Sequence, residues 1–477
     1  MSRVPILCLA FVLMALTPMV QSARAEHPTG EMVEGVACQK DPSQTYTLYL
    51  PPSYDPSQRW PVLLVFDPRG RSVLAAELFR DAAEEYGWII VSSNNTRSDG
   101  PMEPNVRAIN ALWPEVHTRY PSDTSRLYAA GFSGGAHLAY GLAKGTGELA
   151  GVIACGGRFF RDTLEDASFA LFGAAGTTDF NYRHMHTVDE FLEKQGNRHR
   201  LEIFEGTHTW MPRELARLAV EFLEIDAMRR GTRAGDDQLL ARLDGADMKA
   251  AEELEESGSE LAAMRRYRSI VTTFGGVWSV DDPARRAERL EGSVEVKRAT
   301  KEEAKCDRYE ARRVSEFDEV MADLRFAEDE EFASNLERDF RLAELQRRAE
   351  GDGCEAVTAQ RLLDTAYAFT SFYLPRDFFE ERRYERAAES LEVAVSIRQD
   401  NPIVWYNLAC ARARAGDKKE AVEALGQSID NGFRNLDHIE SDADLESIRG
   451  REDYREVVHA LREDDAPGSA GEPGDDR

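Results

Sequence analysis

Cysteine is scarce in this sequence, with six residues among 477, and Cys8 lies in an apolar N-terminal segment. The other five are widely spaced, and no Cys-x-x-Cys pair or Cys/His cluster occurs. These absences exclude a disulfide-rich scaffold and a typical zinc site, so we expect no metal and no other cofactor. Cys306 and Cys354 flank a helical stretch and could form a disulfide, but buried free thiols explain them equally well.

Basic charge is also in short supply, because 59 Lys and Arg residues face 86 Asp and Glu residues, for a net charge of −27. Such a surface repels phosphate backbones and anionic lipid headgroups, which excludes nucleic acid and anionic membrane surfaces as partners. No run after the first 25 residues is long and apolar enough to cross a bilayer, so we expect no membrane span in the mature chain.

The first 25 residues have the pattern of an export signal. Arg3 precedes an apolar run from Val4 to Val20, and the small residues Ala23 and Ala25 follow. A positive head, a short apolar middle and a small-x-small exit predict a cleavable signal peptide over residues 1–25. An uncleaved anchor is the alternative interpretation. We therefore expect an exported protein, either periplasmic or secreted.

Between residues 26 and 230, short apolar runs alternate with amphipathic stretches. Strands are expected at 45–50, 61–66, 88–91, 127–130, 151–154, 169–172 and 201–204, with helices at 73–86, 103–119, 134–143, 181–195 and 212–228. This alternation predicts an α/β domain with a doubly wound, mostly parallel sheet covered by helices on both faces. Functional residues of such sheets lie just beyond the carboxyl ends of the strands.

The first candidate follows the strand at 127–130 and precedes the helix at 134–143. Gly131 to Gly135 fit the G-x-S-x-G pattern around Ser133. In this context the glycines permit a tight strand-to-helix turn that exposes the serine hydroxyl as a nucleophile. The following helix N-terminus, beginning at Gly134, favours a developing oxyanion. Tight packing of strand on helix is the alternative explanation of the glycines.

Two further strand ends carry an acid and a base. Asp179 follows the strand at 169–172 and could orient a histidine, although an acid in the first turn of a helix is an equally good interpretation. His208 follows the strand at 201–204 and could take a proton from serine. The rival histidines, which are His184, His186 and His199, fall on or beside a predicted helix.

The chain order Ser133, Asp179, His208 is the nucleophile–acid–base order of α/β-hydrolases. Residues 45–228 resemble the α/β-hydrolase superfamily, and are most similar to compact secreted esterases of the polyhydroxybutyrate-depolymerase and feruloyl-esterase type. The resemblance implies hydrolysis of an ester through an acyl-serine intermediate, with Ser133 as nucleophile, Asp179 as acid and His208 as base.

One loop departs from these relatives, which usually carry a His-Gly pair after the third strand. Here Phe66 is followed by Asp67-Pro68-Arg69-Gly70, and Pro68 has no N–H to donate. We expect the backbone of Arg69, together with that of Gly134, to form the oxyanion hole. The alternative is that this segment is only a turn. No long insertion between strands suggests a lid.

The region 236–462 is rich in Glu, Arg, Ala and Leu, a composition that favours helices. Residues 378–431 resemble tetratricopeptide repeats, because Trp405, Leu408, Gly416 and neighbouring small residues fall at the offsets of that 34-residue unit. Arg412 stands where the repeat usually has tyrosine. The resemblance implies a surface that binds a protein partner, whereas a helical appendage is the alternative. The tail 463–477 is expected to be disordered.

The sequence thus predicts an exported serine hydrolase, acting on a small-molecule or polymeric ester, followed by an all-α domain with tetratricopeptide-like repeats. An inactive hydrolase-fold scaffold whose repeats bind a protein partner is the second hypothesis. A serine peptidase is the third, since the same three side chains can cleave amides.

Overall fold

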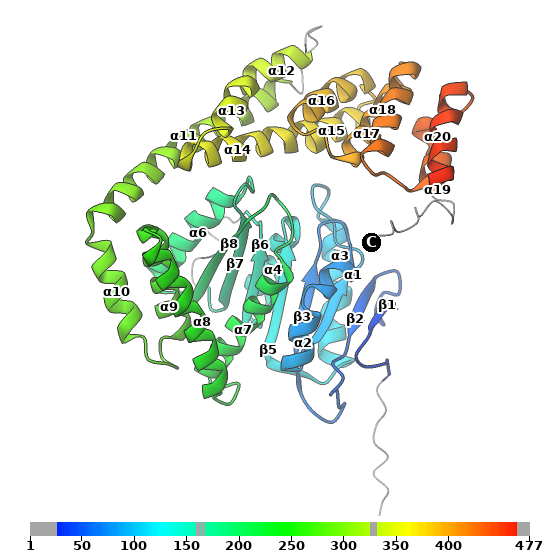
Figure 1. Ribbon diagram of the computed structural model, residues 1–477. Coiled ribbons are helices and arrows are strands. Elements are labelled where there is room, and N and C mark those ends of the chain that lie inside the picture. The colour runs from blue at the N-terminus through cyan, green and yellow to red at the C-terminus, as the bar shows by residue number, and fades with distance from the viewer. Residues whose placement is uncertain (1–25, 159–163, 165–166, 325–331, 465–477) are drawn as a thin grey trace, which may run out of the picture.

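The computed structural model describes residues 26–158, 164, 167–324 and 332–464 (Figure 1). The expected signal peptide, residues 1–25, lies outside the described residues. Of the expected tail, residues 463 and 464 belong to the last helix and the rest lies outside the described residues. Within the described ranges, no helix combines the length and the apolar character needed to cross a membrane.

The first half of the chain is built on one eight-stranded sheet with the order β1-β2-β4-β3-β5-β6-β7-β8. Its strands are β1 (Met32–Ala37), β2 (Thr45–Tyr49), β3 (Trp60–Phe66), β4 (Ile89–Ser93), β5 (Ser122–Phe132), β6 (Gly151–Cys155), β7 (Ala170–Gly176) and β8 (His199–Phe204). Strands β3 to β8 pair in parallel, whereas β1 and β2 form an antiparallel edge. The predicted fold class, a mostly parallel α/β sheet covered by helices and followed by an all-α region, is confirmed.

Helices cover both faces of this sheet. They are α1 (Ser72–Glu77), α2 (Arg80–Tyr86) and α7 (Arg213–Arg229) on one face, and α3 (Glu103–Thr118), α4 (Gly134–Thr146) and α6 (Tyr182–Gln195) on the other. Strand β3 lies in the middle of the sheet with helices on both faces, which explains why its sequence is apolar throughout. Leu63 and Val65 pack toward the first set of helices, and Val62 and Leu64 toward the second.

The second half of the chain is helical. It comprises α8 (Asp237–Glu256), α9 (Glu260–Phe274), α10 (Asp281–Glu291), α11 (Val294–Leu324), α12 (Phe332–Phe340), α13 (Leu342–Ala349), α14 (Gly353–Ala368), the π-helix η1 (Phe369–Tyr373), α15 (Leu374–Glu380), α16 (Tyr384–Ile397), α17 (Pro402–Ala415), α18 (Lys418–Asp430), α19 (Leu436–Ser441), the 3₁₀-helix η2 (Ala443–Leu445) and α20 (Glu452–Asp464). Helices α8 and α9 join it to the sheet edge, where buried Arg200 of β8 pairs with Asp247 of α8 at 2.7 Å.

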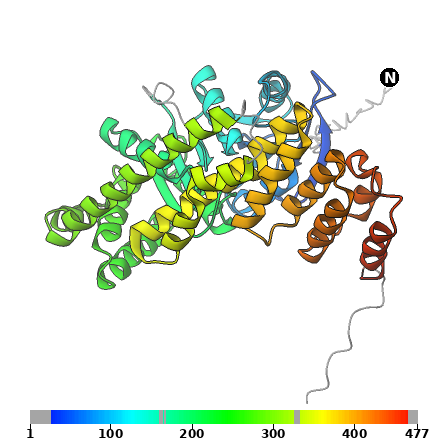
Figure 2. The ribbon, with the colours of Figure 1, turned by 90° about the horizontal axis from the view of Figure 1, so that it is seen from above.

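From α11 onward the helices form an arch across one end of the sheet (Figures 1 and 2). Hydrogen bonds tie this arch to loops of the α/β half, and two of them come from arginine side chains. Arg376 of α15 donates to the carbonyl oxygen of Asp99 at 2.7 Å, and Arg361 of α14 donates to that of Thr177 at 3.3 Å. The helical half is therefore in direct contact with loops that follow strands β4 and β7.

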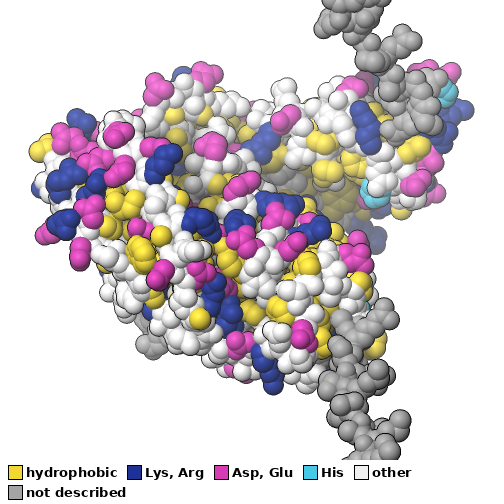
Figure 3. Space-filling model, turned by 60° about the horizontal axis from the view of Figure 1, so that its bottom comes forward, with side chains coloured by type: hydrophobic (Ala, Val, Ile, Leu, Met, Phe, Trp, Pro, Cys, Tyr) yellow, Lys and Arg dark blue, Asp and Glu magenta, His cyan; other side chains and the backbone are white. Residues whose placement is uncertain are grey.

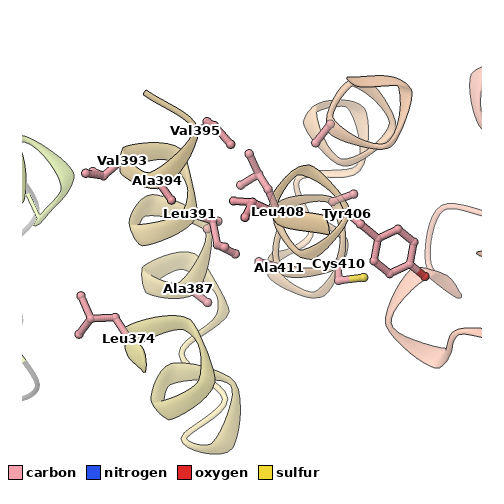
Figure 4. Close-up of a cluster of buried hydrophobic side chains, with 14 of the residues drawn as sticks. Leu374, Ala387, Leu391, Val393, Ala394, Val395, Tyr406, Leu408, Cys410 and Ala411 are labelled. Atoms are coloured by element: carbon pink, nitrogen blue, oxygen red, sulfur yellow. The ribbon is translucent and has the colours of Figure 1, made fainter. Parts of the chain in front are cut away.

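The far part of the arch consists of consecutive helices joined by short loops. Leu391 of α16 points toward α17, where Leu408 and Ala411 lie (Figure 4). Arg412 of α17 forms ion pairs with Glu392 of α16 and with Asp417, which precedes α18. Charged contacts thus connect these three consecutive helices.

Charges of both signs intermingle on the outer surface, so the net negative charge does not collect into one patch on the face seen in Figure 3. Ion pairs across helices account for part of this mixture, as with Arg265 of α9 and Glu303 of α11 at 2.5 Å. Exposed pairs of this kind contribute little stability individually, about 1 kcal/mol or less.

Cys306 of α11 and Cys354 of α14 form a disulfide, with a Cα–Cα distance of 6.2 Å. The sequence left this pairing open between a disulfide and two free thiols. The bond closes a loop with a sequence separation of 48 and connects two of the helices that form the arch.

We expect the double variant Cys306→Ser, Cys354→Ser to be less stable than the wild type by about 2 to 4 kcal/mol, because the open loop gains entropy in the unfolded chain. Thermal unfolding with and without a reductant measures the effect. The reductant should lower the Tm of the wild type and leave that of the double variant unchanged. Equal responses of the two proteins would contradict the prediction.

Candidate active site

Ser133 occupies the turn between β5 and α4 and has φ of 53° and ψ of −119°. A positive φ is rare for serine and is held here by close packing of the neighbouring glycines. A Cβ on Gly131 would lie 2.1 Å from the carbonyl oxygen of Gly135, and one on Gly135 would lie 1.9 Å from that of Phe66. The glycines of the motif are therefore a steric requirement of the turn.

The two other candidate side chains meet Ser133 from neighbouring loops. His208, in the loop after β8, places Nε2 2.9 Å from the Ser133 hydroxyl oxygen and Nδ1 2.9 Å from Oδ1 of Asp179. Asp179, in the loop after β7, is fully buried, and its Oδ1 also accepts the N–H of Asn181 at 2.7 Å. The structure thus joins these three residues in one continuous chain of hydrogen bonds.

Aromatic rings enclose the imidazole of His208. The rings of Phe132 and Phe180 lie 4.7 and 4.0 Å from it, measured between centroids. Gly156 packs directly against the contact between Asp179 and His208. A Cβ at this position would lie 2.7 Å from Oδ2 of Asp179 and 3.1 Å from Nδ1 of His208, so only glycine fits. A dry, tightly packed environment strengthens the electrostatic contact between the carboxylate and the imidazole.

The rival histidines lie elsewhere in the same domain. His199 of β8 pairs with Asp189 at 3.3 Å. His186 of α6 stacks on Tyr182, and burial, assisted by the charge of Arg265, lowers the pKa of His186 to about 4. His184, on the same helix, lines the cleft beside Ser133 without occupying the position of His208.

The expected oxyanion donors differ in their surroundings. The N–H of Gly134 opens helix α4 and has no acceptor within that helix. The N–H of Arg69, in contrast, donates to Oδ1 of Asp67 at 2.8 Å, so it is not available as the expected second donor. The carboxylate of Asp67 also binds the Arg71 guanidinium and the Trp210 indole. Burial would raise the pKa of Asp67, but these hydrogen bonds outweigh it and lower that pKa.

The segment after β3 is therefore the turn that the sequence offered as the alternative. Asp67, as its buried centre, holds the backbone of the loop and links it to the loop after β8 through Trp210. Ser98, in the loop after β4, lies against the turn between β5 and α4, because a Cβ on Gly134 would come within 2.3 Å of the Ser98 Cβ. The N–H of Ser98 in turn donates to the carbonyl of Pro68.

Ser133 opens into a cleft of about 730 Å³ whose walls come from both halves of the chain. The α/β half supplies polar residues such as Ser98, Arg158 and Arg183. The helical half supplies a mixed wall. Its apolar part is formed by Ala311, Val314, Ala368, Phe369 and Tyr373, and its polar part by Glu310, Ser315, Asp318 and Thr365. The substrate space is thus shared between the two halves.

Inspection of the α/β half alone missed this second wall. The expectation that no insertion forms a lid referred to the segments between strands, and the longest of them, 156–168, lies partly outside the described residues. The helices that form the second wall, α11, α14 and η1, instead follow the α/β half in sequence. Their apolar residues have the ordinary spacing of helix packing, which does not distinguish a cleft wall from a core.

The described residues contain no group of three or more His, Cys, Asp or Glu side chains that could hold a metal ion. The reactive features at the cleft are the serine hydroxyl, the imidazole and the carboxylate described above. This set is suited to acyl transfer, in which a hydroxyl attacks a carbonyl and a base carries the proton.

No protein-family model matches the chain. Among curated proteins, it is similar to a chloroplastic protein of Arabidopsis thaliana, with 25% identity over 89 residues, which is 18% of this chain and 27% of that protein. The chain therefore spans about a quarter of the length of this relative.

Similar solved structures are esterases and serine hydrolases. A thermostable esterase is 16% identical with a TM-score of 0.31, and the match covers 38% of this chain and 58%, less than two thirds, of that one. FphF, a fluorophosphonate-binding serine hydrolase of Staphylococcus aureus, is 14% identical with a TM-score of 0.34, over 41% of this chain and 99% of its own. The S-formylglutathione hydrolase FrmB of the same organism is 14% identical with a TM-score of 0.33, over 38% and 92%. The function proposed below rests on the geometry of the site.

Proposed function

We propose that this protein is a serine hydrolase that cleaves a carboxylic ester through an acyl-serine intermediate. The observation that carries the proposal is the relay from Asp179 through His208 to Ser133, with both hydrogen bonds at 2.9 Å. It is supported by the half-buried position of the serine at a strained turn and by the cleft into which that turn opens.

In the proposed reaction, the Ser133 oxygen attacks the ester carbonyl carbon while His208 Nε2 takes the hydroxyl proton. Asp179 holds the Nδ1–H of His208 and stabilises the imidazolium that forms. The N–H of Gly134 binds the oxyanion, and His208 returns the proton to the departing alkoxide. A water molecule then attacks the acyl-serine by the same route, which releases the acid and restores the serine.

We further propose that the protein acts outside the cytosol, after removal of residues 1–25. The disulfide between Cys306 and Cys354 supports this location, since structural disulfides persist mainly in oxidising compartments. The binding of a protein partner by the helical repeats also remains a proposal.

Activity-based labelling of the full purified chain tests the proposed chemistry. A fluorophosphonate probe should label the wild-type protein, and a short-chain nitrophenyl ester should be hydrolysed with a burst of nitrophenol when deacylation is the slower step. A matched panel of nitrophenyl esters and peptide nitroanilides separates an esterase from a peptidase. Absence of both labelling and turnover would favour the inactive scaffold.

The shared cleft yields a prediction about acyl length. Ala368→Trp should fill space beside Ser133 and lower kcat/KM for an octanoyl nitrophenyl ester by about tenfold or more, with a smaller effect on the acetyl ester. Steady-state kinetics on the two esters measures the difference. Ala322→Trp, on an exposed position of α11, is the control and should change neither value. Equal losses for both esters in Ala368→Trp would contradict a role in acyl selection.

A further inference from the structure

We infer that the helical half completes the candidate active site, with Arg361 of α14 as a positioning residue for Asp179. The inference rests on the proposed function, because it assigns Arg361 a task in the same relay. Arg361 Nη1 donates to the carbonyl oxygen of Thr177 at 3.3 Å, and its guanidinium lies 4.3 Å from the ring centroid of Tyr182. Thr177 and Tyr182 lie on either side of Asp179 in sequence, so one side chain holds both flanks of the acid loop.

The acid loop is also held from the α/β half. The N–H groups of Thr177 and Thr178 donate to the carbonyls of Phe204 and Gly206, and the Asn181 amide donates to the carbonyl of Gly156 at 2.7 Å. From the helices above it, α14 contacts the loop through Arg361 and through Asp364, which accepts a hydrogen bond from the Thr178 side chain. Of these two side chains, Arg361 is the one that contacts both flanks of Asp179.

Arg361 is itself held rigidly. It is 5% exposed, and its Nε and Nη2 form a paired contact with the carboxylate of Glu310 on α11, which is 3% exposed. A guanidinium clamped in this two-point geometry loses its rotational freedom, so its remaining N–H groups point in one direction. Nη1 is the group left to reach Thr177.

The disulfide secures the two helices that carry this ion pair. Cys306 lies one helical turn before Glu310 on α11, and Cys354 lies two turns before Arg361 on α14. Burying two charges is costly unless they remain paired in a fixed arrangement, and a covalent bond close by maintains that arrangement. The pair is therefore suited to set the position of the loop rather than to add stability.

The effect on chemistry follows from the geometry of the relay. The Asp179 carboxylate holds the proton of His208 on Nδ1 and keeps Nε2 directed at Ser133. A shift of about 1 Å in such a contact can lower the rate a hundredfold. Arg361 touches neither Ser133 nor His208 through any described contact, so it acts through the loop. Substrate binding depends on the cleft walls and should be affected less than turnover.

The test compares Arg361→Met, Arg361→Lys and Glu310→Gln with the wild type in the full chain. With a short-chain nitrophenyl ester, Arg361→Met should lower kcat by about tenfold to a hundredfold with little change in KM. Arg361→Lys should recover only part of kcat, since one ammonium cannot bind Glu310 and Thr177 in the same geometry.

Arg412→Met is the matched control, since Arg412 also bridges two acids within the helical half but lies far along the arch at α17. It should leave kcat and KM unchanged. Glu310→Gln, which preserves size and shape, decides the outcome if Arg361→Met fails to fold, and it should also lower kcat. Wild-type kcat in the folded variants would overturn the inference, although the proposed function would stand. An inactive wild type would instead refute the proposed function.

Discussion

Ser133→Ala is expected to abolish fluorophosphonate labelling and to lower ester hydrolysis by about 10⁴-fold or more. The hydroxyl is the only atom of the proposed relay that bonds to the substrate, so no neighbouring group can replace it. Labelling by gel fluorescence and kcat/KM on a nitrophenyl ester measure the effect. Serine and alanine bear the same backbone strain at this positive φ, so the substitution should leave the Tm nearly unchanged.

Ser125→Ala provides a control on the same strand, since Ser125 is exposed and its hydroxyl donates only to Asp123 within the described contacts. It should be labelled and should hydrolyse the ester at the wild-type rate. Retained labelling in Ser133→Ala would contradict the proposal. Ser98, which lines the same cleft beside Gly134, would then be the next candidate nucleophile to test.

Gly156→Ala is expected to lower kcat/KM by about a hundredfold or more. The added Cβ would lie 2.7 Å from Oδ2 of Asp179 and 3.1 Å from Nδ1 of His208, so the carboxylate and the imidazole must move apart. Gly156 also has a φ of +54°, which alanine adopts only with strain. Steady-state kinetics measures the loss, and circular dichroism checks that the fold persists.

A second glycine separates the steric effect from the backbone strain. Gly147, at the end of α4, has a φ of +68°, but a Cβ there would meet no atom within 4 Å. Gly147→Ala should therefore cost about 1 kcal/mol of stability and leave kcat/KM unchanged. If both variants lost activity equally, displacement of Asp179 and His208 would not be the cause.

The turn after β3 bears on the choice between an enzyme and an inactive scaffold. Asp67 binds the Arg69 amide, so the second oxyanion donor must come from elsewhere in the cleft or be absent. A site with the Gly134 amide alone would still react with a fluorophosphonate but would turn over esters slowly. Strong labelling combined with weak hydrolysis would therefore identify the oxyanion hole as the limiting feature.

Much of the α/β half could be predicted from the sequence, because strong local patterns carry the information. The run at β3 is apolar on both faces and is flanked by turn residues, and the strands β4 and β6 of the same sheet are likewise buried along their whole length. Strand β1 was not predicted. It is an edge strand with a register shift between Val33 and Val36, and three of its six residues are exposed, so its apolar pattern is weak.

The candidate active site likewise has one part that could be predicted from the sequence and one part that could not. Ser133 lies in a motif of five consecutive residues between a predicted strand and a predicted helix, and the strand ends placed Asp179 and His208 at one edge of the sheet. The partner of the Arg69 amide was not predictable, since the choice of Asp67 depends on its burial against Trp210, distant in sequence. The disulfide was left open for a similar reason, because helical spacing alone does not bring Cys306 to Cys354.

By itself, the sequence determined the sheet, the nucleophile turn and the helical character of the second half, because each depends on residues close together in the chain. Only the tertiary structure decided that the helices cross over the strand ends, supply one wall of the cleft and reach the acid loop through Arg361. Packing between segments more than a hundred residues apart is set by shape and by buried charge pairs, which leave no periodic signal in the sequence.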